Sequence, residues 1–206
     1  MENNVGEGDL ALAVPLEAEV HSEVAVADEH LWVERAKLGH VDAFDLIMAR
    51  YEQRLLRFLI GMVGDVDLAQ ELCQDTFLSA YQALPKMTGE VRLSAWLHTI
   101  ALNRARSHFR KWKLRKTLPI EEDLIQSHEP ELQEATATQE LISRVMDQIP
   151  KQYSEALLLQ ITAGLSCREI GRAVGCSESA VKVRLMRARQ AFKRVYEIEV
   201  REPCKT

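Results

Sequence analysis

Apolar residues recur at steps of three and four positions through most of the chain, which is the spacing of one face of an α-helix. The longest such pattern predicts a helix over residues 41–63, and shorter ones predict helices over residues 31–39 and 66–83. No alternating strand pattern of useful length is present, so the sequence predicts an all-α fold. The apolar positions of the longest pattern are Phe44, Ile47, Tyr51, Leu55, Phe58, Leu59 and Met62.

A loop around Gly89 separates these helices from residues 94–116, which are apolar at helical spacing in the first half and strongly basic in the second. Residues 117–138 contain two prolines, six acids and little apolar periodicity, so we interpret them as a flexible linker. Helical spacing then resumes from about Gln139. The predicted organisation is two small helical domains, residues 31–116 and 139–198, with an acidic, disordered extension at 1–30, the linker at 117–138 and a tail at 199–206.

The end of the second domain has the pattern of a helix-turn-helix. Ser166 is a good N-cap, and Glu169 can reach back to its backbone N–H, so the two residues form a capping box that opens a short helix. Gly175 is suited to end that helix, and Ser177 is suited to cap the next one. The second helix has its apolar side at Val181, Leu185, Ala188 and Phe192.

The opposite side of this second helix is basic. It presents Ser179, Val183 and Met186, flanked by Lys182 and Arg187, and no acid lies between residues 182 and 194. A basic helix after a tight turn suits the major groove of DNA, where side chains meet base edges and cations meet phosphates. A solvated basic face of an ordinary bundle is the alternative, and the capped short helix before the turn favours DNA binding.

Charge is segregated along the chain, so the formal net charge of −5 is a poor guide to its partners. Residues 1–30 hold eight acids and no Lys or Arg, whereas residues 104–116 hold seven Lys and Arg and no acid. Phe109 and Trp112 interrupt this basic run, and cations beside stacking rings are typical of single-stranded nucleic-acid sites. Trp96 lies among apolar neighbours, and we expect it in the core.

Nothing in the sequence predicts a catalytic, metal or cofactor site. Acids and amides at positions 67, 70, 71, 74 and 75 form a polar strip, but no histidine or second acid cluster is spaced to complete a metal or acid–base site. A solvated face or a protein-docking strip is the expected role. The four cysteines, Cys73, Cys167, Cys176 and Cys204, have no CxxC pair and are expected to be reduced, with Cys73 in the core.

No stretch of 18 apolar residues occurs, and the acidic first residues lack the basic and apolar regions of a signal peptide. The sequence therefore predicts a cytoplasmic protein that is not inserted in a membrane. Residues 1–29 are expected to be an acidic tail. In the alternative interpretation, this tail folds back onto a basic DNA-binding face and restrains it.

The ordered set of patterns resembles the extracytoplasmic-function group of bacterial RNA polymerase sigma factors over residues 31–196. The runs that carry the resemblance are LAQELCQDTFLSAYQAL, LSAWLHTIALNRARSHFRK and LSCREIGRAVGCSESAVKVRLMRARQAF. The resemblance implies a dissociable subunit of RNA polymerase, not an enzyme, that recognises the −35 and −10 promoter elements and nucleates DNA melting. Its implied partners are promoter DNA, the clamp of the largest polymerase subunit, the flap of the second largest, and an anti-sigma factor in some cases.

The resemblance also implies site residues. The core polymerase contacts carried over are Glu71, Gln74 and Asp75. The candidates for −10 DNA contact, on the helix that follows the loop at residues 86–93, are Asn103, Arg104, Arg106, Arg110 and Lys111. The candidates for −35 DNA contact are Ser177, Ser179, Lys182, Val183, Arg184, Met186 and Arg187.

The chain departs from the family's pattern at several of these places. Ala180 stands where Thr is common and Ser107 where Asp is common, so one hydroxyl contact to phosphate and one polar contact in the first domain are not expected here. Val183 stands where Ser is common, so the preferred −35 sequence is expected to differ. Gly171 replaces a usual Ala, which weakens the helix by up to about 1 kcal/mol but permits closer packing.

Two other function classes remain open from the residues alone. An autonomous helix-turn-helix repressor or activator would bind duplex DNA without polymerase, usually as a dimer on a two-fold site. An interaction protein for an acidic protein partner would use the same basic surfaces. Two unlike domains without a dimerising helix count against the first class, and the groove-suited helix counts against the second.

Overall fold

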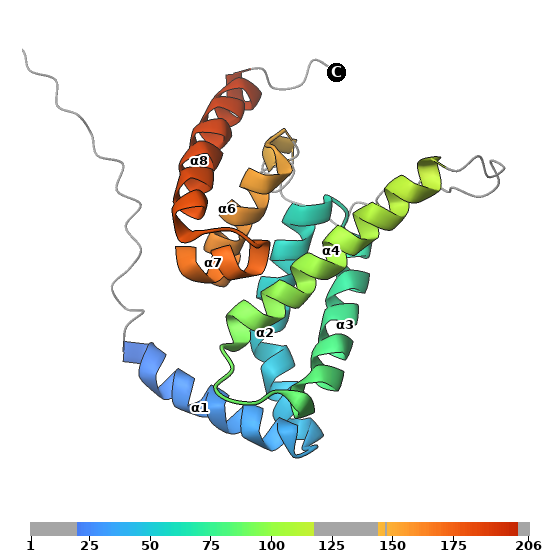
Figure 1. Ribbon diagram of the computed structural model, residues 1–206, viewed down its shortest axis with the longest axis vertical. Helices are drawn as coiled ribbons and strands as arrows, with labels where there is room; N and C mark the ends of the chain where they lie inside the picture. Colours follow the sequence, from blue (N-terminus) through green and yellow to red (C-terminus); the bar gives the residue numbers. More distant parts are fainter. Residues whose placement is uncertain (1–19, 118–143, 147, 202–206) are drawn as a thin grey trace, which may run out of the picture.

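The computed structural model describes residues 20–117, 144–146 and 148–201. All the regular elements in these ranges are helices, which confirms the all-α prediction (Figure 1). They are α1 (Val20–Lys37), α2 (Val41–Val63), α3 (Val66–Ala83), the 3₁₀ helix η2 (Leu84–Lys86), α4 (Leu93–Thr117), α6 (Lys151–Ala163), α7 (Cys167–Val174) and α8 (Glu178–Arg201). No helix in the described ranges is long and apolar enough to cross a membrane.

The boundaries of α2 and α3 are those predicted. Gly64 ends α2 with a φ of 72°, a left-handed conformation that glycine adopts without steric penalty. Asp65 then caps α3, because its carboxylate accepts a 2.9 Å hydrogen bond from the backbone N–H of Leu68. A two-residue connection therefore sets the two helices side by side, and their apolar faces close on each other.

Helix α1 begins at Val20, earlier than the predicted start at Leu31. Its side near α2 is held by Glu29, whose carboxylate lies 2.7 Å from the guanidinium of Arg50 and accepts a 2.9 Å hydrogen bond from the hydroxyl of Tyr51. Burial, together with this carboxylate, raises the pKa of Tyr51 well above its usual value, so the hydroxyl remains a donor. The sequence predicted a tail up to residue 29 because these residues mix acids with small aliphatics and lack aromatics, whereas the contacts of Glu29 with α2 are tertiary.

The helix-turn-helix is built as the sequence predicts. Ser166 and Glu169 form both halves of the capping box at the start of α7. Gly175 ends the helix with a φ of 75°, and the hydroxyl of Ser177 accepts a 3.2 Å hydrogen bond from the N–H of Ala180 at the start of α8. The backbone oxygen of buried Gly171 accepts hydrogen bonds of 2.9 Å from the N–H groups of both Gly175 and Cys176, which pulls the turn against α7.

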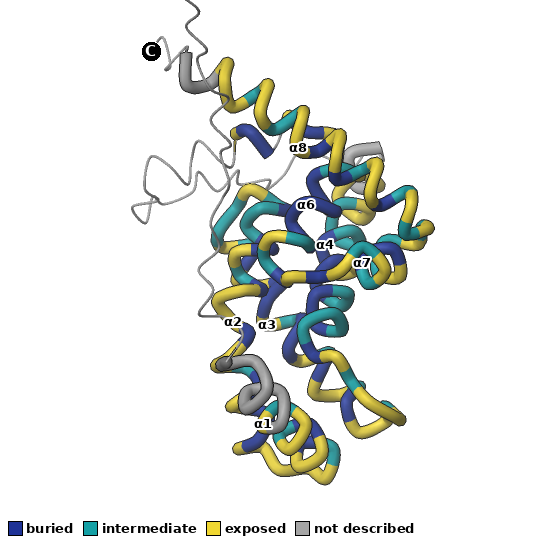
Figure 2. Tube along the Cα trace, turned by 90° about the vertical axis from the view of Figure 1, so that its left-hand side faces the viewer, coloured by how far each residue is buried: buried dark blue, intermediate teal, exposed yellow. Residues whose placement is uncertain are grey.

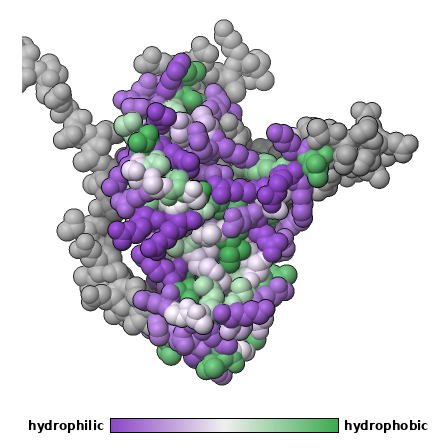
Figure 3. Space-filling view, viewed as in Figure 1, coloured by the Kyte–Doolittle hydropathy of each residue, from purple (hydrophilic) through white to green (hydrophobic). Residues whose placement is uncertain are grey.

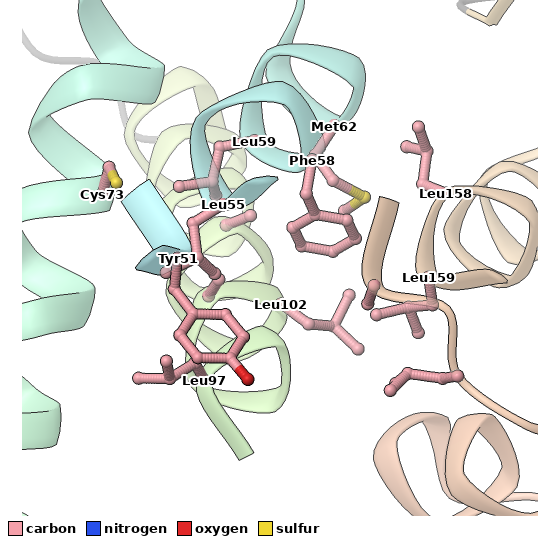
Figure 4. Packing of buried hydrophobic residues seen from close by; sticks show 14 of the residues in the cluster. Tyr51, Leu55, Phe58, Leu59, Met62, Cys73, Leu97, Leu102, Leu158 and Leu159 are labelled. Carbon is pink, nitrogen blue, oxygen red and sulfur yellow. The ribbon is translucent and has the colours of Figure 1, made fainter. Parts of the chain in front are cut away.

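The two predicted domains do not stand apart: their apolar residues form one continuous core. In Figure 1, α2 lies between α3 and α6, and in Figure 4 Phe58 and Met62 face Leu158 while Leu102 approaches Leu159. Gly61 leaves room for the Leu158 side chain, because a Cβ atom at position 61 would lie 2.6 Å from one of its methyl carbons. Figure 2 shows the result as dark blue segments that run from α2 into α6, whereas the outer turns of α1 and α8 are exposed. The predicted linker, residues 117–138, lies outside the described residues apart from Thr117.

His98 is an unusual member of this core. Its ring is fully buried, edge-on to Phe58 with 5.4 Å between ring centroids. Nδ1 lies 2.8 Å from the backbone oxygen of Ser94, and Nε2 has no hydrogen-bond partner. Burial lowers the pKa of His98 to about 4, so the ring is neutral at physiological pH.

The turn of the helix-turn-helix packs tightly on Gly171. Alanine has the better helix propensity, but a Cβ at Gly171 would lie 2.6 Å from the backbone oxygen of Cys176, so the turn has to shift. We expect Gly171→Ala to lower the free energy of unfolding by roughly 1 kcal/mol, measured by chemical denaturation with far-UV circular dichroism. Arg172→Ala, on the exposed side of α7, is the control and should change stability less. A Gly171→Ala variant more stable than the wild type would contradict the tight packing of this turn.

Buried His98 makes the free energy of unfolding depend on pH. The unfolded chain, with an ordinary histidine pKa of 6.5, binds the His98 proton more tightly than the folded chain does. Stability is therefore complete above about pH 6.5 and should fall by as much as roughly 3 kcal/mol as the pH decreases towards 4. His98→Phe should flatten this dependence in urea titrations at a series of pH values. His40→Gln, at an exposed position, should keep the wild-type slope, and equal slopes in all three proteins would refute the assignment.

Candidate nucleic-acid and polymerase interfaces

The predicted groove-reading side of α8 is exposed along one face. Ser177, Ser179, Lys182 and Arg187 are exposed, and Val183 and Met186 are 45% and 52% exposed although both are apolar. Arg184 is half-buried at the edge of the face, while Val181, Leu185 and Ala188 are buried on the other side, as predicted. An apolar pair among cations on a protruding helix can contact thymine methyl groups while the cations contact phosphates.

Two cations of this face already have partners within the second domain. The ammonium of Lys182 lies 3.0 Å from Glu178, one turn earlier, and this hydrogen bond is the main cause that raises the pKa of Lys182. Arg187 donates a 3.2 Å hydrogen bond to the hydroxyl of Tyr153 on α6. Both side chains are exposed, and exposed pairs contribute little, so a DNA phosphate can replace Glu178 at small cost.

The basic half of α4 projects from the body of the molecule, as Figure 1 shows. Asn103, Arg110 and Lys111 are exposed there, and Arg104 is held against α3 by a hydrogen bond to the hydroxyl of Ser79. Trp112 and Leu114 are 49% and 63% exposed near the end of the helix, where Figure 3 shows an apolar spot within a hydrophilic surface. The structure therefore brings cations and an exposed ring together on one projecting helix, the combination that single-stranded nucleic acid requires.

Arg106 behaves differently from the other predicted contacts on α4. Its guanidinium donates to both carboxylate oxygens of Glu155 on α6, at 3.2 Å from Nε and 2.6 Å from Nη2. Glu155 is only 6% exposed. One helical turn further along α4, Lys151 lies over the ring of Phe109, so this ring is also covered by α6. Glu155 was not among the residues predicted from the sequence, although an acid within an apolar helix is a signal of a buried ion pair.

The loop before α4 also meets the second domain. Arg92 lies 2.7 Å from Glu169, the acid of the capping box, and the hydroxyl of Ser94 donates a 2.8 Å hydrogen bond to the backbone oxygen of Ala163. Burial alone would raise the pKa of Glu169, but hydrogen bonds from Ser166 and the charge of Arg92 outweigh it and lower the pKa. Glu169 is therefore ionised, and one carboxylate both opens α7 and contacts the loop.

The polar strip of α3 faces solvent, as predicted. Glu71 and Gln74 are exposed and Asp75 is half-buried. Beside them, a groove of about 530 Å³ runs between α2 and α3, and Leu78 and Tyr81 are 57% and 40% exposed at its margin. Only the polar part of this surface was predicted from the sequence. The residues that line the groove are Phe44, Met48, Glu52, Leu56, Gln70, Cys73, Gln74, Phe77, Leu78 and Tyr81.

The other residues singled out in the sequence are Trp96 and the four cysteines. Trp96 is half-buried and packs on the core, and Cys73 is buried, with a pKa that burial raises to about 11. Cys167 and Cys176 are free thiols, and Cys204 lies outside the described residues. Within the described ranges, no group of three or more His, Cys, Asp and Glu side chains is arranged to hold a metal ion.

Two family profiles match the chain, in the order of its two helical units. Sigma-70 region 2 matches residues 47–115, which span most of α2, α3 and α4, and Sigma-70 region 4 matches residues 139–192, which contain the helix-turn-helix. Together the two matches cover more than half of the 206 residues.

Curated relatives match most of the chain. The RNA polymerase sigma-H factor of Pseudomonas aeruginosa is 29% identical over 188 residues, covering 82% of this chain and 94% of the relative. The ECF RNA polymerase sigma factor SigM of Bacillus subtilis is 33% identical over 156 residues, covering 74% of this chain and 94% of the relative. The fold is similar to that of the sigma factor RpoE of Bartonella quintana, solved with the anti-sigma factor NepR, with a TM-score of 0.61 and 24% identity over 76% of this chain and 98% of that one.

Proposed function

The chain belongs to the ECF RNA polymerase sigma factors, and we propose which of its surfaces perform each step of promoter-specific transcription initiation. The observation that carries the proposal is the placement of three unlike surfaces on one chain. They are the polar strip and groove on α3, the basic projecting half of α4, and the exposed basic face of α8. A sigma factor needs one surface for the polymerase and two for the separated promoter elements.

Helix α8 reads the −35 element. Its first three turns supply the residues that reach base edges, as expected for the recognition helix of a helix-turn-helix. They are Ser179, Lys182, Val183, Met186 and Arg187. Ser177 and Arg184 lie at the border of this face and contact the phosphate backbone. Apolar Val183 and Met186 favour thymine methyl groups over hydrogen-bonding base edges, so they bias the preferred −35 sequence.

Helix α4 reads the −10 element as it melts. Arg104, Arg106, Arg110 and Lys111 bind phosphates, and Asn103 offers an amide to a base edge. Melting needs no chemistry from this chain, because capture of an unstacked base offsets the few kcal/mol that unstacking costs. We therefore assign no catalytic residue, metal or cofactor to the chain. Its site of action is the cytoplasm, where the polymerase meets the promoter.

Core polymerase binds at α3, where Glu71, Gln74 and Asp75 contact the clamp of the largest subunit. Leu78 and Tyr81 extend the polar strip with exposed apolar area, which adds a non-directional attraction to the polar contacts. The second domain lies near the flap of the second largest subunit. The likeness to a sigma factor solved with an anti-sigma factor supports a partner of that class for this chain as well.

The −35 assignment predicts a loss of promoter binding on removal of one cation. Lys182→Ala should weaken binding of the holoenzyme to its promoter by roughly fivefold to tenfold and reduce the slope of log affinity against log salt by about one. Footprinting over a salt series measures both quantities. Lys193→Ala removes the same charge from an exposed position further along α8 and should have little effect. Equal losses in the two variants would mean that α8 supplies only general positive charge.

The docking assignment predicts a separate defect. Glu71→Lys combined with Gln74→Ala should reduce capture of the full chain by core RNA polymerase at least tenfold, because a cation replaces an anion at the contact. Binding of the same variant to −35 duplex DNA should not change. Asp45→Lys combined with Gln53→Ala makes the same kind of change on the exposed side of α2 and is the matched control. Normal capture of the Glu71 and Gln74 variant would show that the docking assignment is wrong.

A further inference from the structure

An acid stands at the start of the helix that reads the −35 element. Glu178 is the first residue of α8, and the next acid along this helix is Glu197. The side chain of Glu178 is 42% exposed and lies on the same edge of α8 as Lys182, one turn later. The first residues of a recognition helix lie closest to base edges, so this carboxylate enters the major groove together with the residues already assigned to it.

Two cations hold this carboxylate, each at a different oxygen. The ammonium of Lys182 lies 3.0 Å from Oε1 of Glu178, and Nε of Arg168 on α7 lies 3.7 Å from Oε2. The hydrogen bond from Lys182 is the main cause that lowers the pKa of Glu178, with a smaller contribution from Arg168, so the group is ionised. The carboxylate therefore lies between the two helices of the helix-turn-helix, with a cation on each side.

DNA affects the two carboxylate oxygens differently. When Lys182 turns to DNA, Oε1 of Glu178 loses its partner, whereas Oε2 keeps Arg168. An ionised carboxylate only accepts hydrogen bonds, and phosphates repel it, so Oε1 needs a donor on a base. In the major groove, cytosine presents the N4 amino group, whereas guanine presents the acceptors N7 and O6 and thymine presents the acceptor O4. Adenine has an amino group with the acceptor N7 beside it, so cytosine is the best partner.

We propose that Glu178 is a specificity-determining residue, whose Oε1 accepts a hydrogen bond from N4 of one cytosine in the −35 element, and that Arg168 positions it. The proposal rests on the proposed function, since α8 is assigned to the −35 element there. Where the cytosine is replaced by guanine or thymine, the ionised oxygen meets another acceptor and stays unpaired. The acid therefore rejects wrong bases as well as binding the right one.

The base preference at each promoter position can be measured with a duplex library randomised at the −35 and −10 elements and selected by holoenzyme containing the full chain. The wild type should select a −35 element with one cytosine that it binds about tenfold more tightly than guanine at that position. Glu178→Ala should lose this preference and keep those at the other positions. Glu178→Gln should tolerate guanine there, because its amide NH₂ donates to O6 or N7. Glu197→Gln removes the same charge from an exposed position of α8 and should keep the wild-type preferences.

A purely structural role of Glu178 has a different signature. An acid in the first turn of a helix stabilises the helix dipole, and loss of that effect would change the affinity equally for all bases. Glu178→Ala with wild-type preferences at every position, whatever its affinity, would therefore overturn the proposal. A wild-type holoenzyme that selects a −10 element but no −35 element would overturn the assignment of α8 itself, and the role of Glu178 with it.

The positioning role of Arg168 is tested in the same library. Arg168→Ala should weaken the cytosine preference about threefold, because Oε2 of Glu178 loses the cation that holds it. Arg172→Ala removes the same charge from an exposed position of α7 and should keep the preference. A uniform loss of affinity with an unchanged preference would identify Arg168 as a phosphate contact and refute its positioning role.

Discussion

Burial of α2 is the constraint on which the rest of the structure depends. Its apolar stripe is wider than one neighbour can cover, so α1, α3, α4 and α6 all pack on it. Phe58 and Met62 lie on the part of the stripe that α6 covers, and Gly61 between them leaves room for the Leu158 side chain. The same helix that organises the first domain therefore also provides the seat of the second, and this shared core brings Glu155 to Arg106.

The sequence predicted most of this molecule where local chemistry decides the structure. The ends of α2 and α3 follow from Gly64 and Asp65, which act within a few residues of their own positions. The capping box and the glycine turn defined the helix-turn-helix for the same reason. The features that could not be predicted depend on residues far away in the sequence. Glu29 of α1 is held by contacts with α2, and the buried state of Glu155 depends on a cation 49 positions away.

In the candidate site, too, features set by local sequence could be predicted and features set by tertiary contacts could not. The exposure of Lys182, Val183 and Met186 was predictable, because they lie opposite the apolar side of an amphipathic helix, and that side must face the core. The exposure of Leu78 and Tyr81 beside the α3 strip could not be predicted, because they recur at the spacing of core residues. Only the structure shows that they line a groove between α2 and α3 and stay exposed. Arg106 looked equivalent to Arg110 in the sequence. They differ only because α6 reaches the first and not the second.

The cations of the two reading surfaces are thus held in unlike ways. Lys182 has an exposed partner on its own helix, and its exchange for a phosphate needs little reorganisation because both groups are already hydrated. Arg106 has a buried partner on another domain, so the exchange requires movement of the domain. On the proposed assignments, a DNA phosphate therefore replaces the exposed partner of Lys182 more readily than the buried partner of Arg106.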